Sequence, residues 1–132
     1  MSSNNIKRYN INNPPPPYVK FNRLKCVQEK YEDFMKSLAN KNISIKEHIN
    51  KTIIKDNIFV ICKNDFPYNI QNYKHLLLWI SPKIKIKVPN YIINMYIYNC
   101  LGLQPNKYIC FENHPSNKSI LNITHYHIFV PV

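Results

Sequence analysis

Residues 75–80 read His-Leu-Leu-Leu-Trp-Ile, and this run stops at Ser81-Pro82. A short, continuous apolar segment that ends at a turn signal predicts a strand buried on both faces of a sheet. Similar apolar segments occur before and after this run in the chain. Three further segments are expected to form strands of the same sheet, namely residues 58–62, 107–111 and 125–130.

The segment directly after this run, residues 83–88, reads Lys-Ile-Lys-Ile-Lys-Val. Strict alternation of charged and apolar residues predicts a strand with one packed face and one solvated face. We expect it to form a fifth, edge strand, on which Lys83, Lys85 and Lys87 face the solvent and protect the edge from pairing.

Two helices are predicted before the first strand. Apolar residues in the segment 25–40 recur at helical spacing and form a single stripe. Ser44 and Glu47 have the spacing of a capping box, which indicates a second, shorter helix that runs to about Lys55.

A third helix is predicted after the alternating segment, with Asn90 as its N-cap. It ends at Gly102, the only glycine of the chain, which occupies a position that favours a positive φ. The order of elements predicts an α+β domain over residues 25–132. It has a small mixed or antiparallel sheet of four to five strands, flanked by three helices.

Residues 1–24 are expected to form an extended arm, because Pro14–Pro17 cannot enter a helix or the interior of a sheet. The arm is either a loose terminus or lies along the domain or a protein partner, which residues 12–21 would contact with Tyr18 and Phe21 as anchors. On the first reading, residues 1–20 are removable without loss of the fold.

The chain of 132 residues carries 18 Lys and Arg against 7 Asp and Glu, a net charge of +11. This balance suits a polyanionic partner. The cations are almost all lysine, however, and asparagine, isoleucine and tyrosine are also abundant. An A/T-rich genome, such as that of a giant DNA virus, would produce the same composition. The excess of lysine therefore has two readings, codon bias and nucleic-acid binding.

Several classes of protein are disfavoured by what the sequence lacks. With one glycine the chain holds neither a nucleophile elbow nor a phosphate-binding glycine loop. The four cysteines include no CxxC pair, which argues against a dedicated zinc knuckle and a disulfide framework. The chain begins without the apolar core of a signal peptide and contains no run typical of a membrane span. We therefore expect an intracellular protein, cytoplasmic or nuclear (in the host cytoplasm or the virion if the protein is viral), with no membrane partner.

Three segments carry the candidate chemistry: a polar loop at 64–68, the strand that starts at His75, and the chain from Phe111 to the last strand. Together they resemble a largely fungal family of unknown function that includes N-acetylglucosamine-induced protein 1. The similarity covers about residues 58–130. It rests on Asn64, Asp65, Phe66, Pro67, Tyr68, His75, Trp79, Phe111, Asn113, Ser119, Ile120, His125 and His127. The resemblance implies no established activity.

His125 and His127 are two residues apart on a predicted strand, so both side chains point to the same face. If the strand that starts at His75 is adjacent, three imidazoles converge with Asp65. Such a group suits a transition metal such as Zn²⁺, with the three histidines as ligands. It also suits a phosphate gripped by a cationic histidine, or plain hydrogen bonding within the fold.

Three hypotheses about function follow. The leading one is a small basic binding module for a phosphate-bearing partner, RNA or DNA in particular, with lysines on phosphates and aromatic rings on bases. Its expected binding residues are Asn64, Tyr68, Trp79, Lys83, Lys85, Lys87, Asn113 and Ser119. The second is a hydrolase or nuclease, with or without a metal ion, in which His75, His125, His127 and Asp65 are catalytic. The third is an assembly protein that docks a partner through the proline-rich arm.

Overall fold

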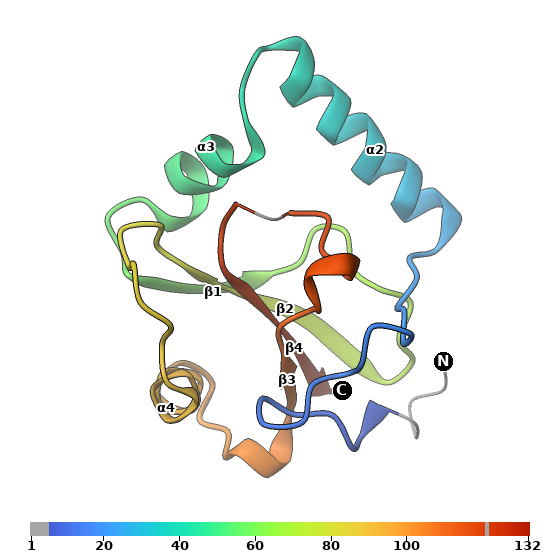
Figure 1. The fold of residues 1–132 in the computed structure, drawn as a ribbon. Coiled ribbons are helices and arrows are strands. Elements are labelled where there is room, and N and C mark those ends of the chain that lie inside the picture. The colour runs from blue at the N-terminus through green and yellow to red at the C-terminus, as the bar shows by residue number, and fades with distance from the viewer. Residues whose placement is uncertain (1–5, 121) are drawn as a thin grey trace.

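A computed structural model describes residues 6–120 and 122–132; residues 1–5 of the predicted arm lie outside that range. Four strands form one antiparallel sheet in the order β1-β2-β4-β3. They are β1 (Phe59–Lys63), β2 (Tyr73–Ile80), β3 (Ile109–Phe111) and β4 (His125–Pro131). The predicted α+β class is therefore confirmed, with a sheet that is antiparallel throughout (Figure 1).

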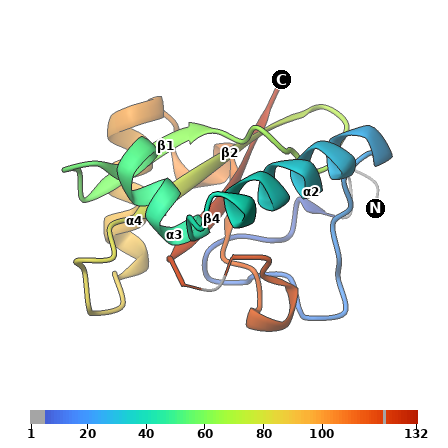
Figure 2. The ribbon, with the colours of Figure 1, turned by 90° about the horizontal axis from the view of Figure 1, so that it is seen from above.

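Three longer helices accompany the sheet: α2 (Lys25–Asn40), α3 (Ile45–Ile49) and α4 (Asn90–Leu101). Figures 1 and 2 show α2 and α3 on the opposite side of the sheet from α4. No helix in the described part of the chain is long and apolar enough to cross a membrane.

The pairing of β2 with β4 sorts the side chains onto two faces. Leu77 lies opposite His127, and Trp79 lies opposite His125. These residues face α3, whereas Leu78, Tyr126 and their neighbours face α4. The second face is a continuous apolar core, in which Leu78, Ile93 and Ile97 are fully buried.

The other face of the sheet carries two apolar clusters with the histidines between them. One cluster joins Leu77 and Trp79 to Ile49 and Ile54.

The second helix starts as predicted, because the Ser44 hydroxyl accepts the N–H of Glu47 at 3.0 Å. A π-helical turn at Asn50–Ile54 follows α3, and its wider winding places Ile54 in the core without solvent exposure.

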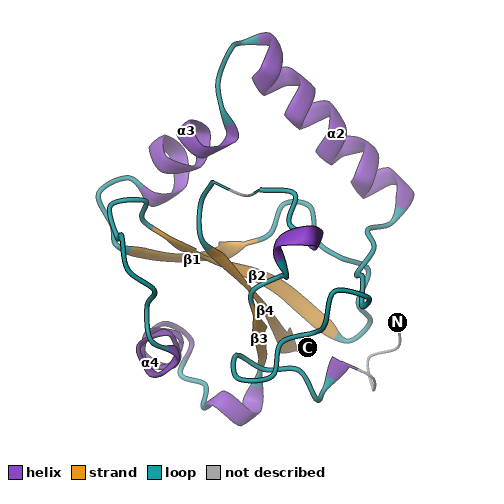
Figure 3. Ribbon diagram, viewed as in Figure 1, coloured by secondary structure: helices purple, strands orange, loops and turns teal. Residues whose placement is uncertain are grey.

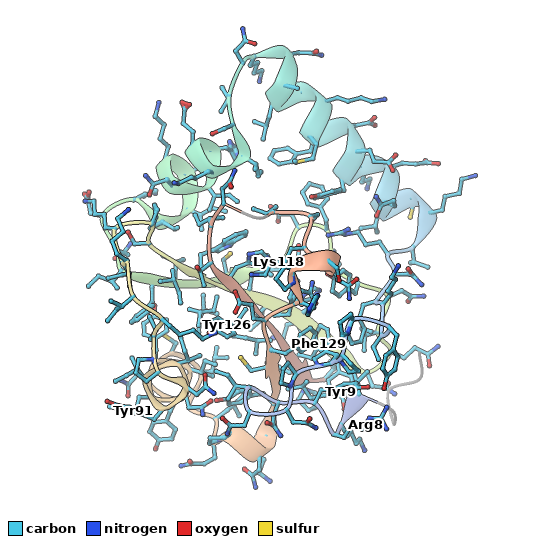
Figure 4. All side chains as sticks on the ribbon, viewed as in Figure 1. Arg8, Tyr9, Tyr91, Lys118, Tyr126 and Phe129 are labelled. Carbon is cyan, nitrogen blue, oxygen red and sulfur yellow. The ribbon has the colours of Figure 1, made fainter. Side chains whose placement is uncertain are left out.

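The second cluster belongs to the N-terminal arm, which lies along the sheet. Ile6, Tyr9 and Val19 are buried against Phe111 and Phe129. Tyr9 and Phe129 are labelled in Figure 4. Phe21 stacks on Phe111 at 5.3 Å, as expected for an anchor, but Tyr18 is 81% exposed and anchors nothing in the fold.

The alternating segment 83–88 is not a strand, and this prediction was wrong. Figure 3 shows loop from the end of β2 to the start of α4. The segment leads from the end of β2 to α4, and its partly buried Ile84 and buried Val88 pack in the same core as that helix. Both sides of β2 are already paired, with β1 and β4, so the segment cannot pair with the strand that precedes it. Val88 still packs in the core, whereas Ile86 is 77% exposed.

The ends of α4 show one correct and one wrong prediction. Gly102 ends the helix in the left-handed region at φ 69°, as expected. Asn90, expected as N-cap, is the first helical residue and makes no cap; Pro89 precedes it. The Asn90 amide instead donates to Asn12 Oδ1 at 2.8 Å, which ties the arm to the helix.

Candidate functional site

The three histidines of β2 and β4 share the face that α3 covers, and all are at least 95% buried. Nε2 of His75 is 2.8 Å from Nδ1 of His127. The ring of His125 packs edge-on against that of His127, with centroids 5.4 Å apart. The expected convergence of the three imidazoles is therefore present. Asp65 lines the same cavity but is exposed to solvent.

A backbone donor fixes the proton of the first imidazole. The N–H of Tyr68 donates to Nδ1 of His75 at 3.1 Å, so the proton of the neutral ring is on Nε2. This Nε2–H faces Nδ1 of His127, which therefore accepts it. The proton of His127 must then be on its own Nε2.

A side-chain amide completes this chain of hydrogen bonds. One terminal atom of the Asn113 amide lies 3.0 Å from Nε2 of His127 and 3.1 Å from the Tyr68 hydroxyl. Because Nε2 of His127 carries a proton, we assign the amide oxygen to this position, where it accepts from both groups. The resulting chain runs from the Tyr68 N–H through both imidazoles to Asn113 and back to the Tyr68 hydroxyl.

Aromatic rings enclose this pair of histidines. The ring of His127 stacks on Tyr68, with centroids 5.2 Å apart, and also on Phe111, with centroids 5.4 Å apart. Phe21 of the arm stacks on Tyr68 in turn, at 5.6 Å. Through Phe21, the arm therefore packs against the aromatic rings that contact His127.

Burial keeps the three imidazoles neutral. It lowers the pKa of His75 to about 3, with a smaller effect from the positive charge of Arg23. Burial, followed by the neighbouring His75, holds the pKa of His127 well below 6.5. The pKa of His125 is also lowered, again chiefly by burial. A cationic histidine that grips phosphate, one of the expected roles, is therefore disfavoured at neutral pH.

The expected metal site with His75, His125 and His127 as ligands is not assembled. Within residues 6–120 and 122–132, no three His, Cys, Asp or Glu side chains are arranged to hold a metal ion. The reason lies in the pair itself, because His75 and His127 direct their facing nitrogens at each other.

The positive charge in the site comes from a residue that the sequence analysis missed. The Arg23 guanidinium lies over the ring of Tyr31 at 4.3 Å and near the ring of Tyr68 at 5.2 Å. Its Nε donates to the Phe66 carbonyl at 2.7 Å. A possible signal was present, since Arg23 is one of only two arginines beside sixteen lysines.

A cavity of about 190 Å³ lies between this face of the sheet and the helices α2 and α3. Arg23, Tyr31 and Phe34 line it from the α2 side, and His48 and Ile49 from α3. Among the expected site residues, those that line the cavity are Asn64, Asp65, Tyr68, Trp79, Asn113, Ser119, His125 and His127.

The remaining expected residues are elsewhere. His75 lies behind the cavity wall, hydrogen-bonded to His127. Lys83, Lys85 and Lys87 are exposed on the loop after β2 and do not line the cavity. Lys87 instead makes an ion pair with Glu112 at 3.4 Å.

Two side chains of the cavity wall shape its polarity. Asn64 caps the loop at 64–68, since its Oδ1 accepts the N–H of Phe66 at 2.8 Å. The indole Nε1–H of Trp79 is buried, with no hydrogen-bond partner among the described residues. A buried donor without a partner carries a desolvation cost of about 1–3 kcal/mol, which a ligand acceptor would offset.

Comparison with known proteins supports this fold and assigns no activity. No curated protein matches the chain. A solved structure described as "Crystal Structure of HTC1" has the same fold, with a TM-score of 0.59 and 18% sequence identity. The match covers 85% of this chain and 76% of that one. A family model described as "Protein of unknown function (DUF3605)" matches residues 16–131, which include every residue of the cavity wall, and the chain belongs to this family.

Proposed function

We propose that the protein binds a phosphate-bearing ligand by receiving one nucleotide in the cavity between the sheet and α2/α3. The observation that carries the proposal is the wall of this cavity, where aromatic and imidazole rings surround one held arginine. A designed apolar cavity of about 150 Å³ accepts benzene, and the cavity here has about 190 Å³. It therefore has room for one planar ring.

Arg23 is the group that would meet the phosphate. Two of its nitrogens are used, Nε on the Phe66 carbonyl and Nη1 on Gln28 Oε1 at 3.3 Å. Guanidinium carries five N–H donors, so others remain for a phosphate oxygen. The tyrosine rings on either side hold the charge in place, which lowers the ordering cost of binding.

The histidines have a different role in this proposal. Because they are neutral, the two histidines that line the cavity offer no charge: His127 offers its ring face, and His125 offers its free nitrogen as a hydrogen-bond acceptor. They suit the N–H or O–H groups of a base or a sugar.

The exposed lysines extend the proposal to nucleic acid. Lys83 and Lys85 lie outside the cavity, so they would attract the neighbouring phosphates of a longer chain. A nucleotide of RNA or DNA and a free nucleotide share the chemistry that the cavity would recognise. The length and the salt dependence of the bound ligand distinguish them.

The assembly hypothesis retains one supporting observation. Tyr18, at the end of the proline run, is 81% exposed, whereas Ile6, Tyr9 and Val19 of the arm are buried against the sheet. A protein partner at residues 12–21 would contact this ring. The relation to N-acetylglucosamine-induced protein 1 and the viral origin also stay predictions.

Trp79 is the only tryptophan and lines the cavity, so its fluorescence reports binding directly. We would titrate AMP, UMP, inorganic phosphate, and adenine and uracil oligonucleotides at two salt concentrations. Both nucleotides, but not phosphate alone, are expected to change the emission. Arg23→Gln should weaken binding by about tenfold or more, the scale of one charge-assisted hydrogen bond.

The matched control is the variant in which Lys83, Lys85 and Lys87 are all replaced by Gln. It should bind mononucleotides as the wild type does. If the ligand is single-stranded nucleic acid, its salt slope for oligonucleotides should fall by about 2, from three lost phosphate contacts. Equal affinity for mononucleotides and oligonucleotides would assign the site to free nucleotides. Failure of every nucleotide to bind, or binding that Arg23→Gln leaves unchanged, would contradict the proposal.

A further inference from the structure

His125 differs from the other two buried histidines in having one free ring nitrogen. Its Nδ1 lies 3.1 Å from the carbonyl oxygen of Ile123. A carbonyl only accepts, so Nδ1 carries the proton and Nε2 carries the lone pair. No described residue is hydrogen-bonded to Nε2, and this atom is not among the fully buried unpartnered ones. His125 lines the cavity, and Nε2 is the polar atom that it can offer to a ligand.

The ring is held in this orientation. Trp79 packs against it with centroids 4.8 Å apart, and His127 packs edge-on against it. The hydrogen bond from Nδ1 to the Ile123 carbonyl fixes both the tautomer and the orientation of the ring. Such an arrangement, a nucleophilic atom oriented by a second group on a rigid strand, is typical of covalent catalysis.

The other histidines lack this combination. His75 and His127 use their nitrogens on each other, on the Tyr68 N–H and on Asn113. His48 is half-buried on α3 and His114 is exposed on a loop. Among these histidines, only His125 both has a fixed nitrogen lone pair and lines the cavity in which the phosphate-bearing ligand is expected.

We propose that Nε2 of His125 is a nucleophile that accepts a phosphoryl group from the ligand in the cavity. This inference rests on the proposed function, and it names a phosphate ester or anhydride as the substrate class. The lone pair of Nε2 attacks phosphorus, so that an N–P bond forms while the bond from phosphorus to the leaving oxygen breaks. The leaving oxygen departs with the electron pair and takes a proton from water.

The ring that results is cationic, and its Nδ1–H remains bonded to the Ile123 carbonyl, whose partial negative charge stabilises it. Water then attacks the phosphorus, the N–P bond breaks, and the electron pair returns to Nε2. The proton that this water loses neutralises the hydroxide left when the leaving oxygen was protonated. The protein is restored and phosphate is released. Burial lowers the pKa of the His125 imidazole, so the lone pair of Nε2 is free at neutral pH.

The test uses phosphoramidate, a small phosphoryl donor whose transfer to an imidazole forms the N–P bond and releases ammonia. The wild-type protein is incubated with it, and the phosphohistidine of each peptide is measured by mass spectrometry under alkaline conditions. His125 is expected to react about tenfold faster than His114, which is outside the cavity. It should also react faster than His48, which lines the same cavity but is not oriented by a hydrogen bond to the ring from any described residue. AMP in excess should protect it, and His75 and His127 should remain unmodified.

The comparison among five histidines of one folded protein requires no variant. A His125→Gln variant with an unchanged melting temperature adds a control, since it should lose the modification at this position while His48 and His114 react as in the wild type. If AMP binds and His125 reacts no faster than His48 and His114, the nucleophile is refuted and the binding function stands. If His125 reacts selectively but AMP neither binds nor protects, the nucleotide proposal fails instead.

Discussion

Acidification is expected to destabilise this protein through its buried histidines. The unfolded chain binds a proton on His75 with a pKa of 6.5, whereas the folded protein does so with a pKa of about 3. Since the folded pKa is lowered, the unfolded state binds more protons between these values, and stability falls as the pH falls. Linkage gives a loss of about 2 kcal/mol at pH 5 for one such histidine.

The pKa values of His125 and His127 are shifted in the same direction, so their losses add to that of His75. The total loss at pH 5 is therefore between about 2 and about 6 kcal/mol, out of the roughly 5–15 kcal/mol typical of a domain. Above about pH 7.5 the loss of stability is almost zero, because the imidazoles are neutral in both the folded and the unfolded state.

Urea denaturation followed by Trp79 fluorescence, at a series of pH values, measures this loss. The slope of the unfolding free energy against pH counts the protons taken up on unfolding. His75→Gln should lower that count by close to one at pH 5, which lies between the unfolded pKa of 6.5 and the folded pKa of about 3. A free energy of unfolding that stays constant from pH 7.5 to pH 5 would refute the neutral, buried state of these rings.

Three further predictions concern stability, and urea denaturation at pH 7.5 checks each. Deletion of residues 1–20 should cost about 4 kcal/mol or more, because Ile6, Tyr9 and Val19 lose their burial; a loss below 1 kcal/mol would mean that the arm is not packed. Leu78→Ala should cost about 2–5 kcal/mol as a cavity in the α4-side core, with the exposed Ile86→Ala as a nearly neutral control. Gly102→Ala should cost about 1–2 kcal/mol through its positive φ alone, since a Cβ there meets no atom within 4 Å; no loss would contradict the left-handed C-cap.

The strands and helices were predictable where the signal is local. The apolar run that begins at Leu76 is buried on both faces as its pattern predicts, and Gly102 marks the end of its helix. The run that begins at Ile58 also forms a strand, but as an edge strand it is only half-buried. The alternating pattern at 83–88 led to a wrong prediction because a strand also needs a free sheet edge to pair with. The sequence of the segment does not show whether such an edge is available. The packing of the arm was hidden for a related reason, since Ile6 and Tyr9 are isolated in a polar stretch.

The site was predictable in its histidines and not in its cation. Alternation on one strand places His125 and His127 on the same face whatever the rest of the fold does. Arg23 is held in the site by its hydrogen bond to the carbonyl of Phe66, forty-three residues further along the chain. No local sequence pattern predicts such a contact. Which histidine nitrogens are occupied depends on Tyr68 and Asn113, and therefore on the closed fold.

Helix α2 contributes only one buried side chain, Leu38, to the protein, although it forms part of the wall of the cavity. Segments with little buried apolar surface open at a low free energy, while the strands beneath open only with the whole domain. The amide hydrogens of α2 should consequently exchange with solvent much faster than those of β2 and β4. Access to the cavity is then governed by the local unfolding of one helix, on a timescale separate from that of the sheet that carries the histidines.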